Sequence, residues 1–295
     1  MANSSGGQSK GKLQEKSAEF SQSDVKEVEE HTWLPAPLVY QIVRKEGEHE
    51  LRRPAVSLWW SGLAAGMCIG LSVYGKGILH VHLPDAEWRP LVENFGYCIG
   101  FLVVILSRHQ LFTENTITPI LPLMVRRSWS CLIAVARLWF IVAAANLVGA
   151  AIFALFWTYS QIADAELLDA MRAVGRTTLD NGLTAMFTKA IAAGFLMAAL
   201  VWIMPSAKGA QFWVIVVISY LIAVADLTHI VSGGVGVLLL IPAGEAHLLD
   251  FLVDFGIPVL LGNILGGTAL FSVIVYAQVH QELKRASQED AEDDD

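Results

Sequence analysis

The chain has 295 residues, a net charge of -8, 54% hydrophobic residues and a mean hydropathy of +0.50. This composition predicts an all-α polytopic membrane protein and excludes a nucleic-acid-binding protein, because no basic stripe is present. The cysteines are odd in number, lie in apolar surroundings and lack metal-site spacing. We therefore expect small core residues rather than disulfides, a metal site or a cofactor site at Cys68, Cys98 and Cys131.

The polar N-terminal region precedes any apolar segment. Residues 1–32 are rich in Ser, Gly, Gln, Glu and Lys, which predicts a disordered arm. Residues 33–55 have apolar side chains on one side of a helix and charged ones elsewhere, a pattern typical of an amphipathic helix on the membrane surface. A solvated linker is the alternative, and Gly47 predicts a bend. Because the first apolar segment begins only at Val56, no cleavable signal peptide is expected.

Six apolar segments within residues 56–279 predict six membrane spans, since a crossing helix needs about 20 apolar residues. They cover residues 56–80, 95–125, 129–159, 182–205, 212–242 and 251–279. Residues 161–180 form a polar link, and residues 280–295 an acidic tail. Lys and Arg are more frequent near the spans on the side of the termini, so we predict that arm, amphipathic helix and tail are all cytoplasmic.

Two of the six spans are interrupted by polar residues. The second is broken at residues 107–115, and the fifth at its centre, where Asp226, Thr228 and His229 precede two glycines. Irregular backbone at membrane depth must be buried in protein or line a water-accessible cavity. A pair of broken helices is also the best sequence indication of a transport site.

Short motifs recur in the same order in the two halves of the chain. Asn146 and Asn263 each lie in a stretch rich in small residues, and Ala-Ala-Gly occurs at 64–66 and at 192–194. In the breaks, we match Leu111-Phe112-Thr113 with Asp226-Leu227-Thr228. With three spans in each half, we expect two inverted three-helix repeats and a binding site between the broken helices.

Four stretches resemble the formate/nitrite transporter family, and the likeness covers residues 37–279. These stretches are residues 44–54, 111–113, 228–229 and 262–267. The overall pattern is most similar to a bacterial inner-membrane branch of that family. The resemblance implies an aquaporin-like fold, a homopentamer with one pore in each protomer, and passage of small monovalent anions or their conjugate acids.

The resemblance also assigns the centre of the pore. His229 matches the family's central histidine, Thr113 the threonine that faces it, and Leu111 a constriction leucine. An ionisable group inside a membrane segment is a functional candidate by default. The structural alternatives are a core imidazole for His229 and a local backbone cap for Thr113.

Two constrictions are implied on either side of this centre. Tyr97 and Phe101 match the cytoplasmic-side constriction, with Tyr97 in place of a phenylalanine, and Ile222 falls where the periplasmic-side phenylalanine is expected. Simple helix packing is the alternative for these apolar residues. The candidate pore and substrate residues are His229, Thr113, Thr228, Leu111, Tyr97, Phe101 and Ile222.

Two family positions differ in this sequence. The family lysine before the fourth span aligns near Thr178, and the fourth-span asparagine aligns with Gly194. We expect Lys189, Arg172 or Arg176 to supply the missing vestibule charge; Lys189 has the alternative of snorkelling to the outer interface.

Other polar residues near the breaks have expected structural roles. Asp226 and Glu114 are expected to cap the N-termini of half-helices, where the helix dipole favours negative charge. Asn146 and Asn263 are expected to join helices by hydrogen bonds. Basic groups in the first break, Arg108 and His109, are expected to pair with acids, with solute contact as the alternative.

These patterns predict a channel or proton-linked transporter for a small monovalent acid. An apolar constriction would reject the bare anion, because stripping a charge of water is costly. Because the intrinsic pKa of an imidazole is near neutral, His229 would exchange a proton with the bound acid. The alternatives are a neutral-solute pore with the same fold and a non-conducting scaffold or sensor. The sequence contains neither a nucleophile motif nor a phosphate-binding loop, so we do not expect an enzyme.

Overall fold

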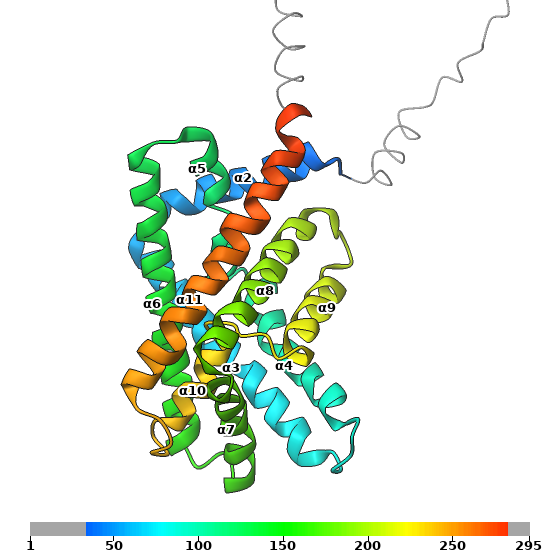
Figure 1. The fold of residues 1–295 in the computed structure, drawn as a ribbon, viewed down its shortest axis with the longest axis vertical. Helices are drawn as coiled ribbons and strands as arrows, with labels where there is room; N and C mark the ends of the chain where they lie inside the picture. Colours follow the sequence, from blue (N-terminus) through cyan, green and yellow to red (C-terminus); the bar gives the residue numbers. More distant parts are fainter. Residues whose placement is uncertain (1–33, 283–295) are drawn as a thin grey trace, which may run out of the picture. The chain divides into compact units, whose positions relative to one another are not determined.

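The computed structural model describes residues 34–282, and the regular structure within this range is helical. The predicted arm, residues 1–32, lies outside the described residues, as does the acidic tail from residue 283. Figure 1 shows the arrangement of the helices. They are α2 (Ala36–Arg52), α3 (Ala55–His82), α4 (Arg89–Leu106), α5 (Ile120–Arg126), α6 (Trp129–Tyr159), α7 (Ala165–Asp180), α8 (Gly182–Ile203), α9 (Gln211–Val224), α10 (Ser232–Leu240) and α11 (Ile257–Ile264).

Five helices within residues 34–282 are long and apolar enough to cross a membrane. They are α3, α4, α6, the stretch Gly182–Ser206 that contains α8, and the stretch Asp250–Glu282 that contains α11. The last stretch has π-helical turns at Asp250–Gly256 and Leu265–Ser272. The apolar helix α9 is shorter, with 14 residues. Residues 161–180, expected to be only a polar link, contain the helix α7.

The amphipathic segment forms α2, which continues through Gly47 without a bend, so the predicted bend is wrong. Buried residues recur every fourth position on one face, at Val39, Val43 and Gly47. A glycine is required at position 47 by close packing and not by a bend. A Cβ there would overlap the carbonyl group of Thr118, because α2 lies directly against the chain that leads into α5 (Figure 1).

Glycines allow two pairs of helices to approach within backbone contact. Gly66 of α3 lies directly against the backbone of Asn146 in α6. Gly194 of α8 lies in the same way against the backbone of Asn263 in α11. Gly149 and Gly266, each three residues after its asparagine, face the carbonyls of residues 63 and 191. The two helix pairs therefore use the same contacts.

Within the predicted second and fifth spans, the chain leaves the α-helix at residues 107–119 and 225–231. Both departures have the same geometry. Two residues after the helix ends, Arg108 (φ 60°) and Asp226 (φ 49°) adopt the left-handed conformation. The next N–H bonds back five residues, His109 to Val104 O at 3.1 Å and Leu227 to Ile222 O at 2.9 Å. This is the Schellman arrangement that ends many helices.

Replacing Gly66 by alanine should destabilise the protein, because the new Cβ forces α3 away from the backbone of α6. We expect a loss of about 1–3 kcal/mol, typical of overpacking, and a lower unfolding temperature in detergent. Met67→Leu, at the exposed neighbouring position, is the matched control. An unchanged unfolding temperature for Gly66→Ala would contradict the close approach.

Candidate functional site

Two buried asparagines hold the two non-helical segments. Asn146 of α6 accepts a hydrogen bond from Phe112 N at 2.8 Å and donates to the carbonyls of Gln110 and Gly62, both at 2.8 Å. Buried backbone groups without partners are costly in an apolar medium. One carboxamide therefore satisfies a donor and an acceptor of the first segment and ties them to α3.

Asn263 of α11 makes the same set of contacts with the second segment. Its oxygen accepts from Ile230 N at 2.9 Å, and its nitrogen donates to Thr228 O at 3.1 Å and to Ala190 O of α8 at 2.8 Å. The expectation that these asparagines join helices through hydrogen bonds agrees with this geometry. What the sequence did not indicate is that their main partners are the breaks themselves.

The contacts correct the predicted match between the two breaks. Gln110 and Thr228 occupy equivalent places, as do Phe112 and Ile230. The sequence match of residues 111–113 with 226–228 is therefore wrong by three positions. The sequence match compared side chains. In the structure, the equivalent residues of the two breaks are those whose backbone groups bond to Asn146 or Asn263. The match of 64–66 with 192–194 agrees with the glycine contacts.

His229 and Thr113 meet between the two segments. Thr113 Oγ1 lies 2.8 Å from His229 Nε2, and both residues are fully buried. The other ring nitrogen, Nδ1, accepts the N–H groups of Val231 and Ser232 at 3.3 and 3.4 Å. These donors assign the neutral ring with its proton on Nε2, which donates to Thr113. The Thr113 hydroxyl hydrogen has no acceptor among the described residues.

Aromatic residues of α4 enclose the histidine. The Phe101 ring meets the imidazole edge to face, with centroids 5.1 Å apart, and Tyr97 lies one turn away. The Tyr97 hydroxyl hydrogen-bonds Ser232 Oγ at 2.5 Å, at the start of α10. Leu111 and Ile222 are also buried. The centre of the site is therefore closed by side chains.

One predicted pore residue points elsewhere. The Thr228 hydroxyl donates to the carbonyl of Met186 in α8 at 2.6 Å. Its hydrogen is thus used to bind the second segment to α8 and is not available to a solute. This local packing role had no sequence signal.

The expected capping by acids is wrong. Neither α5 nor α10 has a side-chain N-cap. Asp226 follows the end of α9 and accepts hydrogen bonds from Lys189 at 2.6 Å and from Asn181 at 3.2 Å. Glu114 lies in the 3₁₀ turn Glu114–Thr116, before α5 begins. Neither acid lies at the N-cap of a half-helix, because the helices begin and end at residues that the sequence did not reveal.

Two of the three predicted vestibule cations have partners of their own, and the third, Arg172, has a buried Nε with no hydrogen-bond partner among the described residues. Besides Asp226, Lys189 donates to Asn181 Oδ1 at 2.6 Å, next to the start of α8, so its ammonium is paired. Arg176 binds Asp169 and Glu245, each at 2.6 Å, outside the candidate spans. Arg172 lies on the same helix as Arg176, α7.

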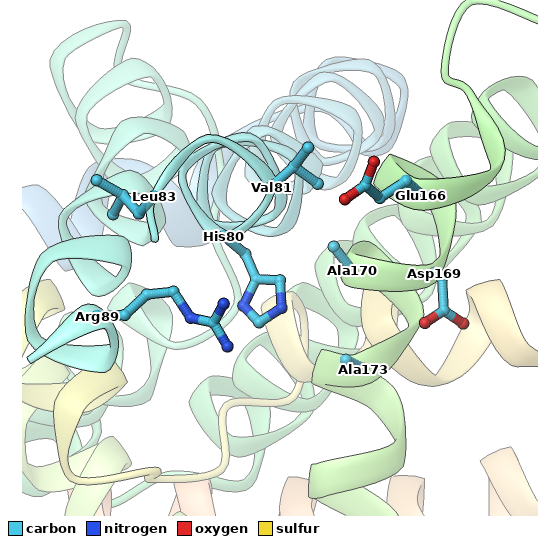
Figure 2. Close-up of a pocket in the computed structure, with 8 residues that line it drawn as sticks. All are labelled: His80, Val81, Leu83, Arg89, Glu166, Asp169, Ala170 and Ala173. Carbon is cyan, nitrogen blue, oxygen red and sulfur yellow. The ribbon is translucent and has the colours of Figure 1, made fainter. Parts of the chain in front are cut away.

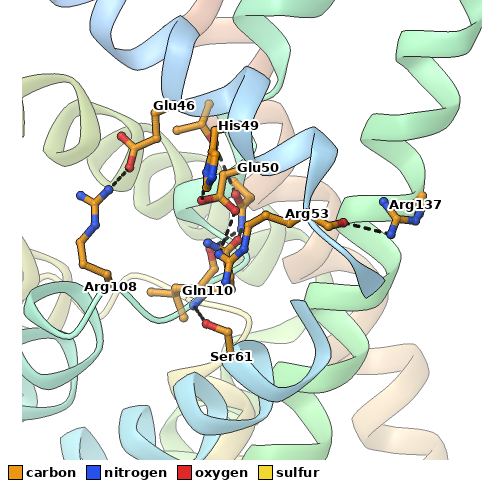
Figure 3. A network of polar contacts seen from close by, with 11 residues as sticks. Glu46, His49, Glu50, Arg53, Ser61, Arg108, Gln110 and Arg137 are labelled. Atoms are coloured by element: carbon orange, nitrogen blue, oxygen red, sulfur yellow. Dashed lines mark hydrogen bonds and ion pairs between the residues drawn. The ribbon is translucent and has the colours of Figure 1, made fainter. Parts of the chain in front are cut away.

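The first segment is also bound to α2 by charge pairs (Figure 3). Arg108 pairs with Glu46. Outside this view, Arg126 at the end of α5 pairs with Glu48 of α2 at 3.2 Å. The expected pairing of Arg108 with an acid is therefore confirmed. Arg137 of α6 donates to the carbonyl of Arg53 at 3.1 Å (Figure 3).

A second cluster of charges, which sequence reasoning missed, surrounds Glu93 of α4. This buried carboxylate accepts from His80 Nδ1 at 2.8 Å and lies 3.9 Å from Lys76 Nζ and 4.0 Å from Arg89 Nε. Lys76 and His80 are one turn apart on α3. The sequence feature that could have indicated this cluster is Glu93, an acid within an apolar helix.

A pocket of about 320 Å³ lies beside this cluster, not at His229. His80 and Arg89 project into it from one side, and α7 forms the other side (Figure 2). Its lining residues are His80, Val81, Leu83, Arg89, Glu166, Asp169, Ala170 and Ala173.

The comparison with protein families decides the identity. The sequence model of the formate/nitrite transporter family matches residues 37–277. The chain belongs to the formate/nitrite transporter family. Members of this family are membrane channels or transporters and not enzymes, so this protein is a membrane transporter. The apolar helices described above agree with this class.

Individual relatives support the same family. The chain is 40% identical over 256 residues to the inner membrane protein YfdC of Escherichia coli (strain K12), covering 87% of this chain and 83% of that protein. It is 26% identical over 253 residues to the formate channel FocA of Haemophilus influenzae, covering 75% of this chain and 86% of that one.

Solved structures share the fold of this family member. A pentameric formate channel with formate bound superposes with a TM-score of 0.66 at 19% identity, covering 77% of this chain and 98% of that one. An ion channel of the family superposes with a TM-score of 0.67 at 20% identity, covering 81% and 98%.

Substitution of Asn263 by leucine should destabilise the protein strongly. It leaves Ile230 N–H and two carbonyls without a partner, and each unsatisfied buried group costs about 1–3 kcal/mol. We expect a large drop in the unfolding temperature in detergent, with a similar drop for Asn146→Leu. Gln278→Leu, at an exposed position near the end of the chain's last described helix, is the control. Wild-type stability in both variants would contradict the role of these asparagines as hydrogen-bond partners of the two non-helical segments.

Arg176 should affect stability in a pH-dependent way. Its hydrogen bonds hold the pKa of Asp169 and of Glu245 below the usual carboxyl range. A carboxyl group with a lowered folded-state pKa stabilises the fold above its unfolded pKa, and this contribution disappears as the pH falls through the folded-state value.

Arg176→Gln should therefore lower the unfolding temperature slightly at pH 7, because the pairs are exposed, and the difference from wild type should vanish in acid. Unfolding temperatures across pH measure this, with the exposed Arg52→Gln as control. A difference that grows in acid would contradict this assignment.

Proposed function

We propose that this protein is a channel or transporter for small monovalent anions or their conjugate acids, with proton linkage through His229. The observation that carries the proposal is the 2.8 Å contact between His229 Nε2 and Thr113 Oγ1, at the meeting point of two non-helical segments. Buried donors fixed at that point can bind one small polar solute. A hydrophobic enclosure that includes Phe101, Leu111 and Ile222 excludes larger or hydrated ones.

The proposed architecture is six spans in two inverted three-helix repeats, with the second span formed by α4 and α5 and the fifth by α9 and α10. Matching asparagine, glycine and helix-end contacts in the two halves support it. We place the protein in a bacterial inner membrane as a homopentamer with both termini cytoplasmic. The description of YfdC as an inner membrane protein and of a structural neighbour as pentameric supports this proposal.

This orientation changes one expectation for the constrictions. α4 begins at Arg89, directly after the loop that follows α3. With a cytoplasmic N-terminus, that loop is periplasmic, so Tyr97 and Phe101 lie on the periplasmic side of His229 and not on the cytoplasmic side. Ile222 is near them, because Tyr220 of α9 bonds to Leu91 O at the start of α4.

The transport mechanism that we propose depends on the cost of desolvation. A bare anion that leaves water for an apolar constriction loses its hydration, and Tyr97, Phe101 and Leu111 offer little in return. The conjugate acid crosses more easily. Hydrogen bonds from His229 Nε2 and the Thr113 hydroxyl then hold it at the centre.

Proton linkage places a specific demand on His229. In its resting state the ring is neutral, and Nδ1 is occupied by two backbone donors. To deliver a proton to the solute from Nε2, the ring must first gain one at Nδ1, which requires these two bonds to open. Glutamine at this position can donate a hydrogen bond but cannot relay a proton.

Formate uptake by proteoliposomes that contain the full chain should rise as the pH falls, more steeply than the fraction of protonated acid alone, because His229 relays a further proton. His229→Gln should retain part of the flux but lose the dependence on pH that exceeds this proportion. His247→Gln, in an exposed loop, is the control. An identical pH profile in His229→Gln and wild type would sink the proton linkage.

The same assay separates the remaining functional alternatives. Glycerol or water flux without any formate flux would identify a neutral-solute pore. Absence of flux for every small solute would favour a non-conducting scaffold or sensor.

A further inference from the structure

We infer that Lys76 is an anion-binding residue at the periplasmic mouth of the proposed pore. This inference rests on the proposed function, and it names the cation that receives the anion before the Tyr97 constriction. Lys76 was not among the vestibule cations expected from the sequence. The ligand is a small monovalent oxyanion such as formate, which an ammonium group binds by charge-assisted hydrogen bonds.

Two of the three expected vestibule cations, Lys189 and Arg176, are already engaged; the third, Arg172, makes no ion pair among the described residues and lies on α7, not at the contact between α3 and α4. Lys189 donates two hydrogen bonds of 2.6 Å, to Asp226 and Asn181. Arg176 is held by two carboxylates at the surface. A cation that is tightly paired with an acid attracts an anionic solute only weakly, because the field of the acid largely cancels its own.

Lys76 is different from these residues. Within residues 34–282, its nearest carboxylate is Glu93, at 3.9 Å, beyond hydrogen-bond distance, and no oxygen accepts a hydrogen bond from its Nζ. Glu93 itself is engaged by His80 at 2.8 Å. The Lys76 side chain is only 25% exposed, and its ammonium is still accessible to water. Three unused donors on a largely buried cation favour an anion as the missing partner.

Backbone packing places Lys76 beside the constriction. Gly75 and Gly96 bring α3 and α4 into contact, and a Cβ on Gly96 would lie 2.6 Å from the backbone N of Lys76. Gly96 directly precedes Tyr97. Asp226 lies within electrostatic range of both Lys76 and Tyr97, so α3, α4 and the second break converge here. An anion held at Lys76 is thus adjacent to the residue that closes the path to His229.

The pocket in Figure 2 lies one helical turn from Lys76. His80 and Arg89 line the pocket, and both surround Glu93, the carboxylate next to Lys76. Lys76 is one helical turn further along α3 from the pocket than His80. Basic side chains from the pocket wall (His80, Arg89) and Lys76 therefore surround the same carboxylate, Glu93, which lies too far from the Lys76 ammonium for a hydrogen bond.

Anion binding by the purified full chain tests this inference without any flux measurement. Sodium formate should raise the unfolding temperature of the wild type in detergent above a sodium gluconate control at equal ionic strength. Lys76→Met should weaken the apparent formate affinity roughly tenfold or more, as expected for loss of a charge-assisted hydrogen bond. Lys76→Arg should keep most of the effect. Lys208→Met, in an exposed loop, should behave as wild type.

The outcome is distinguishable from a failure of the proposed function. Equal formate stabilisation in wild type and Lys76→Met, or none in wild type, would overturn the subsite. If Lys76→Met fails to fold, Lys76→Gln replaces it, with its unfolding temperature without formate as the check. A wild type that binds formate through Lys76 but carries no formate into proteoliposomes would support the subsite and refute the transport proposal.

Discussion

The structure depends on two buried carboxamides that satisfy the backbone of two interrupted helices. An interruption in an apolar surrounding exposes N–H and C=O groups that water cannot reach, and each would cost free energy if it stayed unpaired. Asn146 and Asn263 each bond to an N–H and a C=O of one segment and to a carbonyl of a neighbouring helix. The irregular segments can persist only because these partners are in place.

The central histidine is a consequence of this arrangement. Since Asn263 fixes Thr228 and Ile230, the residue between them, His229, has its backbone held on both sides. The first turn of α10 then supplies the N–H groups that bind Nδ1, and Thr113 from the other segment meets Nε2. The direction and tautomer of the ring are thus set by two backbone N–H groups and Thr113, as the proposed transport site requires.

Several cations of this protein are paired with acids, and in our proposal this pairing decides which of them can bind a solute. Lys189, Arg108 and Arg176 each have a carboxylate partner on another segment, so they join parts of the fold. Lys76 is held at a longer distance from its acid, beside the aromatic constriction. A count of basic residues along the sequence cannot separate these cases, because it does not include the distance to the nearest acid.

The sequence by itself determined the class of fold, the position of the interruptions and the meeting of His229 with Thr113. Apolar segment length and the demand for paired backbone carry that information locally, and the family resemblance added the pairing. Only the tertiary structure decided the register between the two halves, the engagement of Thr228 with α8, the pairing of Asp226 with Lys189 and the distinct state of Lys76. These depend on ångström-scale distances between side chains far apart in the chain, which residue type and spacing do not encode.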